Sequence, residues 1–312
     1  MYSKWSKFLL LIFLGLIGVA VVLEVGLRIL GANHPVLYQT DPVLGYRLEP
    51  DQGVTFFGNA ISINRHGVRD ERDFDSRLPD TTRILVLGDS VTWGGVRLSQ
   101  RDLFTSVLER ELGDAEVINA GINGYSVWRM TALYREYLRG LQPDVIVLYL
   151  IPGDFHRAAV VDLVRTSPAF PLKKPAFALS SALASARIVL AAKLDWDWLQ
   201  PERPDKPRDT LAAEDRVRQN IEAITQFARE LSEDQRLLVV VSPFSDHSKN
   251  PPLPLSVNEA MDDAGIEILN LKDEDLRAPD NFADHIHLST QGHARVGRTL
   301  AEYLRSTERK EN

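Results

Sequence analysis

The chain has 312 residues, of which 44% are hydrophobic and 25% charged, a composition typical of a globular protein with a full apolar core. The formal net charge of -7 gives no electrostatic driving force for binding nucleic acid, so no nucleic-acid partner is expected. The absence of cysteine excludes disulfides, thiolate metal sites and a thiol nucleophile.

The N-terminus predicts a membrane-directed segment. An uncharged, almost wholly apolar run extends from Phe8 to Leu23, and Lys4 and Lys7 precede it. A bilayer core requires ~20 residues, a length reached when the helix continues to Leu30. We expect residues 1–32 to form a cytoplasmic tail and an uncleaved signal anchor, with the rest of the chain outside the cytoplasm. A cleaved signal peptide and a buried helix of a soluble domain are the alternatives.

Residues 33–80 predict a small β-rich extension followed by a linker. Two short β-like stretches, at 54–57 and 60–63, are separated by turn-forming residues. The polar stretch at 69–82 is interpreted as the linker.

From residue 81 to 308, short apolar runs alternate with helical patterns, which predicts an α/β domain. The expected strands are 84–87, 117–118, 145–150, 237–241 and 266–269. The continuous, β-branched run at 145–150 suits the central strand of a parallel sheet. Right-handed crossovers then imply a three-layer α/β/α sandwich with five mostly parallel strands. A proline-rich stretch at 155–209 is interpreted as an insertion, whose Trp196 and Trp198 either bind a sugar or lipid or dock the insertion.

Ser90 is the candidate nucleophile. It follows Gly88 and Asp89 where the first predicted strand of the sheet turns into a helix, and glycine allows a tight turn there. This position leaves the serine N–H near a helix N-terminus, which favours developing negative charge. The competing interpretation is that Asp89 or Ser90 only caps the helix.

Asp284 and His287 are the candidate groups that activate this serine. A serine hydroxyl needs a base to take its proton, and the base works best when a carboxylate orients it. A spacing of three residues lets Asp284 reach one imidazole nitrogen of His287 while the other faces Ser90. Two alternatives compete: a metal site formed by His287 with His285 and His293, and an Asp284 that only forms a turn.

These motifs, in this order, resemble the SGNH hydrolases, the GDSL esterase and lipase superfamily, over roughly residues 81–305. Gly88-Asp89-Ser90 resembles the first block of the family and Asp284 to His287 the last. Gly121, within 119–126, resembles the second-block glycine that donates its N–H to the oxyanion. The resemblance implies a flavodoxin-like sheet, Ser90, Asp284 and His287 as catalytic residues, an oxyanion hole formed by the N–H groups of Ser90 and Gly121, and no metal or organic cofactor.

The third block departs from the family pattern. Family members carry Gly-x-Asn-Asp, with the asparagine as an oxyanion donor, whereas this chain has Ile151-Pro152-Gly153-Asp154. An ionised Asp154 would repel an oxyanion.

The leading hypothesis is a serine esterase acting on acyl esters of carbohydrate or lipid, O-acetyl groups among them. The alternatives are an O-acyltransferase using the same serine, and a catalytically weak envelope carbohydrate-binding or assembly protein.

Overall fold

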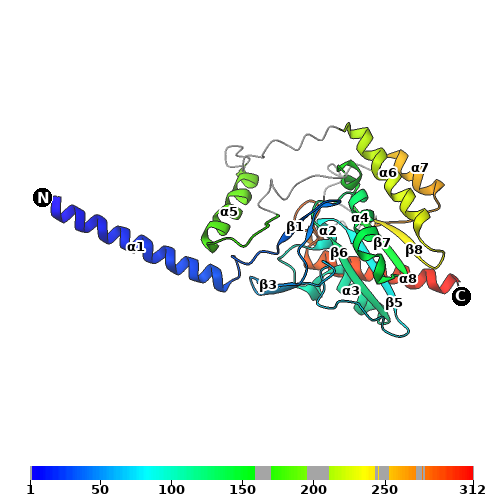
Figure 1. Cartoon of the computed structure of the whole chain (residues 1–312), viewed down its shortest axis with the longest axis horizontal. Helices are drawn as coiled ribbons and strands as arrows, with labels where there is room; N and C mark the ends of the chain where they lie inside the picture. The colour runs from blue at the N-terminus through cyan, green and yellow to red at the C-terminus, as the bar shows by residue number, and fades with distance from the viewer. Residues whose placement is uncertain are drawn as a thin grey trace.

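The computed structural model describes residues 2–158, 170–194, 211–242, 245, 253–271, 276 and 278–311. The chain runs from a long N-terminal helix through two β-hairpins into an α/β domain (Figure 1). Of the expected insertion at 155–209, residues 159–169 and 195–209 lie outside the described residues, and Trp196 and Trp198 are among them.

A parallel sheet forms the centre of the α/β domain and confirms the predicted fold class. Within the described residues its strands have the order β6-β5-β7-β8-β9, so β7 is central, as predicted. Every neighbouring pair in this sheet is parallel. The bounds are β5 Thr82–Gly88, β6 Ala115–Gly121, β7 Val145–Leu150, β8 Arg236–Val241 and β9 Glu267–Asn270.

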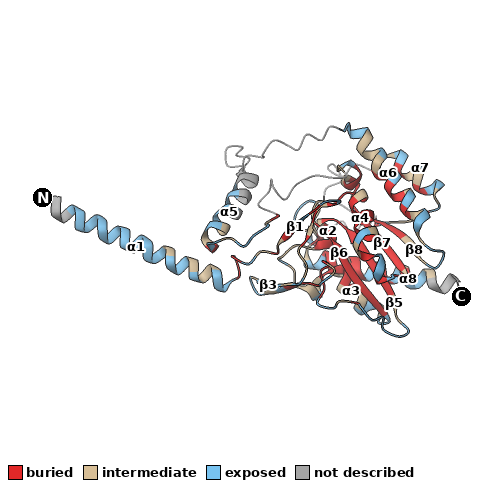
Figure 2. Ribbon diagram, viewed as in Figure 1, coloured by how far each residue is buried: buried red, intermediate tan, exposed pale blue. Residues whose placement is uncertain are grey.

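Helices cover both faces of the sheet, and the strands β5, β6 and β7 between them are almost wholly buried (Figure 2). One face of β5 places Leu85 and Leu87 in a core shared with α4, α6 and α7, and the other places Ile84 and Val86 in a core shared with α3 and α8. This alternation follows from the two-residue period of a strand. The helices are α3 Phe104–Leu112, α4 Val127–Leu133, α6 Ala213–Glu230, α7 Leu255–Asp263 and α8 Thr290–Glu311.

The strand order places a topological switch point between β5 and β7. The chain leaves β5 toward β6 on one side and returns to β7 on the other. Ligands of open α/β sheets bind at the carboxyl edge beside such a point, because the connections diverge there. The segments after β5 and β7 therefore flank the expected binding position.

Two antiparallel hairpins precede the sheet. The predicted stretches at 54–57 and 60–63 correspond to β3 (Gln52–Phe56) and β4 (Asn59–Ile63), and a second hairpin, β1 (Tyr38–Asp41) with β2 (Gly45–Leu48), was not predicted. The start of the segment at 69–82, which was interpreted as a linker, is not a linker in the structure. Arg69 is fully buried and Asp70 nearly so, because both pack into the α/β domain.

The N-terminal helix α1 (Tyr2–Ile29) extends away from the rest of the chain (Figure 1). Its segment Trp5–Ile29 has a mean hydropathy of 2.9, and none of it is buried against protein. An apolar helix of this length that is not buried against protein is suited to a membrane anchor or a signal sequence.

Candidate active site

Ser90 lies at the carboxyl end of β5, where the strand turns into the short helix α2 (Ser90–Trp93). Gly88 is required at this turn, because a Cβ there would lie 2.0 Å from the Oγ1 of Thr92. Asp89 caps α2, since its carboxylate accepts a backbone N–H of the helix at 2.8 Å. The cap is therefore Asp89, and the Ser90 hydroxyl remains available for chemistry.

The three predicted catalytic side chains form one hydrogen-bonded chain. His287 Nε2 lies 2.9 Å from Ser90 Oγ, and His287 Nδ1 lies 2.7 Å from Asp284 Oδ2. The other oxygen of Asp284 accepts the backbone N–H groups of Ile286 and His287 at 2.9 and 2.8 Å. These bonds fix the carboxylate, and the carboxylate in turn fixes the imidazole toward the serine.

The charge state of Asp284 suits this arrangement. Burial alone would raise the pKa of Asp284, but the backbone N–H groups of His287 and Ile286 and the imidazole outweigh it. The pKa of Asp284 therefore lies below its ordinary value, and the carboxylate stays ionised at neutral pH. The side chains of His287 and Asp284 are 40% and 48% exposed, so the site is open to a substrate.

The other two histidines near the site lie in different environments. His285 is exposed, and its carbonyl oxygen accepts the N–H of Ser245. His293 is buried, stacks on Phe104 and accepts the Phe104 N–H through Nδ1 at 3.1 Å. Burial lowers the pKa of His293 to about 3, so its imidazole is neutral. Among the described residues, no group of three or more histidine, aspartate or glutamate side chains is arranged to hold a metal ion.

Gly121 lies at the carboxyl end of β6, directly against α2. A Cβ at Gly121 would lie 2.3 Å from the backbone nitrogen of Trp93, so this close approach demands glycine. The N–H of Gly121 was expected to serve the oxyanion. Instead it donates to the Asn119 side chain at 3.0 Å, and the residue is buried. This donor is thus occupied within the chain.

Gly124 is a second glycine in the same loop, and its role was not predicted from the sequence. It adopts φ 73°, in the left-handed region that favours glycine, and it is partly exposed. No hydrogen bond in the described part of the chain uses its N–H. The neighbouring Asn123 donates its side-chain amide to the Tyr38 hydroxyl at 2.9 Å. The Asn-Gly dipeptide was the signal in the sequence, because it marks a turn with an exposed backbone.

The third block forms a short 3-10 helix, η4 (Pro152–His156), directly after β7. Asp154 is fully buried, and its carboxylate accepts the Ile151 N–H at 2.9 Å and pairs with Arg157. Burial and the charge of Asp89 raise the pKa of Asp154 well above its ordinary value, although Arg157 lowers it. The Asp154 carboxylate is therefore bound by groups of its own loop. The repulsion of an oxyanion that its charge would cause is offset by Arg157.

Arg157 joins the three loops that surround Ser90. Its Nη1 donates to Asp89 at 3.0 Å, to the Tyr125 carbonyl at 2.8 Å and to Asp154. These partners belong to the nucleophile turn, the Gly124 loop and the third block, respectively. Nothing in the sequence marked this arginine, which lies at the start of the expected insertion.

A second arginine, Arg69, is fully buried and supports the segment that follows α2. Arg69 donates through Nη1 to the carbonyls of Trp93 and Gly95 at 2.6 Å each, and through Nη2 to Leu98 at 2.7 Å. Its guanidinium stacks over the Trp93 ring at 4.8 Å. Trp93 is 2% exposed and therefore packs in the core.

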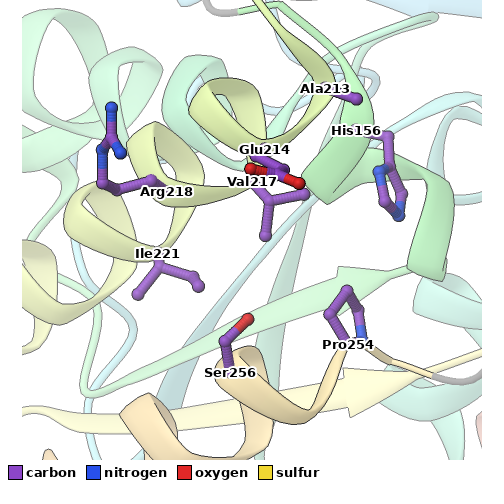
Figure 3. A pocket seen from close by; sticks show the side chains of 8 residues that line it. All are labelled: His156, Ala213, Glu214, Val217, Arg218, Ile221, Pro254 and Ser256. Atoms are coloured by element: carbon purple, nitrogen blue, oxygen red, sulfur yellow. The ribbon is translucent and has the colours of Figure 1, made fainter.

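A hollow of about 480 Å³ lies beside η4, between the starts of α6 and α7 (Figure 3). It belongs to the carboxyl edge of the sheet, because η4 follows β7 and α7 follows β8. Its walls are mainly apolar, with several polar groups at the rim. The lining residues are His156, Ala213, Glu214, Val217, Arg218, Ile221, Pro254 and Ser256.

The comparison with protein families identifies one match. The family described as the GDSL-like lipase/acylhydrolase family matches residues 86–295, more than half of the chain. The matched span contains Ser90, Asp284 and His287 as well as the three loops joined by Arg157. No curated protein matches the chain.

Solved structures of similar fold include several from bacteria. The chain is similar to a lipase/acylhydrolase from Enterococcus faecalis, with 13% identity, a TM-score of 0.43, and coverage of 73% of this chain and 97% of the other. It is similar to an inhibitor-bound aryl esterase from M. smegmatis, with 17% identity, a TM-score of 0.40, and coverage of 72% and 99%. It is also similar to an acetylxylan esterase from Geobacillus stearothermophilus, with 13% identity, a TM-score of 0.40, and coverage of 71% of this chain and 94% of the other.

Proposed function

Because the chain belongs to the GDSL-like lipase/acylhydrolase family, we propose that it is a serine ester hydrolase in which Ser90 is the nucleophile. The observation that carries the proposal is the hydrogen-bonded chain from Ser90 through His287 to Asp284, at 2.9 and 2.7 Å. This geometry is that of a serine with its base and the carboxylate that orients the base.

The reaction proceeds through an acyl-serine. Ser90 Oγ attacks the acyl carbonyl carbon while His287 Nε2 takes the hydroxyl proton. His287 then gives this proton to the departing alcohol oxygen, and the ester bond breaks. Water repeats the sequence against the acyl-serine, which releases the carboxylic acid and restores Ser90. The ionised Asp284 holds the imidazole in place and stabilises the imidazolium that forms in each half.

The oxyanion is held by backbone N–H groups. The first donor is the N–H of Ser90, which lies at the start of α2. For the second donor the geometry favours Gly124 over Gly121, because the Gly121 N–H is bonded to Asn119 and the Gly124 N–H has no partner in the described part of the chain. Gly153 supplies no side-chain amide, so turnover is expected to be modest, since one such donor is worth ~10²–10³ in kcat.

The helix α1 is proposed to remain as an uncleaved anchor. Lys4 and Lys7 then stay in the cytoplasm, and the hydrolase domain lies outside the cytoplasmic membrane. Substrates within reach of such a domain are esters of envelope carbohydrate or lipid, with O-acetyl groups among them. Intact mass of the membrane-extracted protein distinguishes the anchor from a cleaved signal peptide.

The test of the proposal combines active-site labelling with turnover. The full-length protein is treated with a fluorophosphonate probe and, separately, with p-nitrophenyl esters of increasing chain length. We expect labelling and hydrolysis in the wild type and in Ser306→Ala, an exposed serine far along α8, and neither in Ser90→Ala. Labelling that persists in Ser90→Ala would refute the assignment. Product analysis with an added sugar acceptor separates hydrolysis from acyl transfer.

A further inference from the structure

The hairpin β3–β4 is attached to the end of α1 by its tip. The N–H of Phe57 donates to the carbonyl of Leu30 at 2.8 Å. Gly31 lies so close to this hairpin that a Cβ there would be 1.8 Å from the carbonyl oxygen of Thr55. The tip of the hairpin is therefore held where the apolar span of α1 ends.

Phe57 itself is an unusual residue for this position. It adopts φ 47° in a tight turn with Gly58, although a bulky side chain is disfavoured in the left-handed region. Phe57 is 52% exposed, and its ring contacts that of Phe56 with the centroids 4.8 Å apart, so much of the side chain still faces outward. Strained residues of this kind persist where they serve a function. A large aromatic ring exposed beside a membrane span suits the bilayer interface.

The helix α5 (Ala178–Leu194) is attached to the same end of α1. Glu24 accepts the N–H groups of Ala178 and Leu179 at 3.0 and 2.8 Å, and Arg28 donates to the Ala176 carbonyl at 2.6 Å. Charged side chains in a membrane-directed helix lie toward the interface, because the bilayer core disfavours them. Glu24 and Leu30, the two attachment points, are only ~9 Å apart along the helix axis. Both attachments therefore lie at a similar depth relative to the membrane.

The exposed side of α5 is mainly apolar, with Arg187 on the same face as Leu183 and Leu190. The helix carries only two charged residues, and Leu183 and Leu190 are 62% and 46% exposed, as is Phe177 just before it at 62%. Lys173 and Lys174, both exposed, precede this segment and suit anionic headgroups. Figure 1 shows α5 running across the direction of α1 rather than along it, which is the orientation of a helix that lies in the membrane plane.

We propose that the tip of the β3–β4 hairpin, Phe177 and α5 form a second membrane contact, seated in the interface of the bilayer that α1 enters. The proposal rests on the proposed anchoring by α1 and not on the ester hydrolysis. The occupant is a lipid surface, because these apolar groups are continuous with the membrane span through the bonds of Glu24, Arg28 and Leu30. The contact would fix the orientation of the hydrolase domain over the membrane.

The absence of native cysteine makes a direct test available. Single variants Phe57→Cys and Leu183→Cys of the full-length protein are spin-labelled in vesicles containing anionic lipid. Collision rates with oxygen, which concentrates in lipid, and with a water-soluble nickel complex report the depth of each label. Leu16→Cys in the middle of α1 is the lipid-buried reference, and Glu302→Cys on the exposed side of α8 is the aqueous reference.

We expect the oxygen-to-nickel ratio at residues 57 and 183 to be several-fold above that at 302 and below that at 16. Ratios at 57 and 183 equal to that at 302, with residue 16 in lipid, would overturn the proposal while leaving the anchor intact. An aqueous ratio at residue 16 would overturn both. Phe57→Asn should keep the turn, since asparagine tolerates the left-handed region, and lower the ratio measured at 183.

Discussion

Arg157 Nη1 lies 3.0 Å from the buried carboxylate of Asp89, the residue directly before the nucleophile Ser90. The same nitrogen contacts the carbonyl of Tyr125 and the carboxylate of Asp154. One guanidinium therefore sets the relative positions of the three loops that define the proposed oxyanion hole. This relationship makes Arg157 a positioning residue, because it acts through the loops rather than on the substrate.

Arg157→Gln should lower both stability and turnover. Loss of the guanidinium leaves Asp89 buried without its ion-pair partner, a change that costs about 3 kcal/mol of unfolding free energy. Displacement of the loops should lower kcat by about 100-fold, because misplacement of reacting groups by ~1 Å has that effect. Denaturant unfolding and p-nitrophenyl ester kinetics measure the two effects.

Arg135→Gln is the matched control, since Arg135 pairs with Glu230 away from the site. This surface pair should contribute less than ~1 kcal/mol, and kcat should not change. Arg157→Lys should recover part of the stability and little of kcat, because an ammonium cannot reach all three loops in the same geometry. A kcat that is unchanged in Arg157→Gln would contradict the positioning role.

Asp284→Asn should abolish the orientation of His287 while leaving the fold intact. The expected loss in kcat is ~10³–10⁴, as for a neutral amide in place of a triad carboxylate. Asp280→Asn, an exposed carboxylate in the same loop, should retain wild-type kcat. Equal activity of Asp284→Asn and the wild type would exclude Asp284 from the triad.

The depressed pKa of Asp284 also predicts a pH dependence of stability. A carboxylate whose pKa is lower in the folded state stabilises the fold above its unfolded pKa of ~3.9 and loses this contribution as pH falls through the folded pKa. The wild type should therefore exceed Asp284→Asn in unfolding free energy at pH 7, and the difference should shrink below about pH 4. Denaturant titrations at a series of pH values measure this difference.

Asp154→Asn should change stability with the opposite sign. The pKa of Asp154 is raised in the folded state, so its ionisation destabilises the fold once pH exceeds its unfolded pKa. Asparagine carries no charge and still offers an oxygen to the Ile151 N–H. The variant should be more stable than the wild type at pH 8, with the advantage vanishing near pH 3. A variant less stable than the wild type at pH 8 would contradict the raised pKa.

Apolar runs in the sequence were sufficient to predict the sheet, whereas the proposed triad came from residue types, their spacing and the family resemblance. Each strand of the sheet contains a short apolar run, and the run at 145–150 coincides with β7. Asp284 and His287 could be assigned because their contact is local, three residues apart. The four-residue strands β1 and β2 are too short to show a period, and they went unpredicted.

The supporting residues of the site could not be predicted in this way. Arg157 bonds to Asp89 and Tyr125, which are 68 and 32 residues away in sequence, and Arg69 bonds to Trp93, 24 residues away. An isolated arginine in a polar segment shows no pattern that distinguishes a buried guanidinium from a solvated one. Gly121 was assigned as the donor because a sequence shows where a glycine is and not what its N–H is bonded to.

Gly153→Asn should restore the missing oxyanion donor. Gly153 is partly exposed and has a φ outside the left-handed region, and the nearest atom to a Cβ there is Ile151 Cδ1 at 3.8 Å, so a side chain fits. In the family pattern an asparagine at this position donates to the oxyanion, so its amide is expected to act there in this chain as well. The expected gain is ~10–100-fold in kcat, somewhat below the ~10²–10³ that a donor in an evolved site contributes.

Gly153→Leu distinguishes the effect of the amide from the effect of adding a side chain, because leucine has nearly the same shape as asparagine and no hydrogen-bond donor. It should leave kcat at or below the wild-type value. Gly153→Asp should lower kcat, since a carboxylate beside the oxyanion repels it. If the asparagine and leucine variants have equal kcat toward p-nitrophenyl acetate, the third block does not face the oxyanion, and the donors must all come from the loops after β5 and β6.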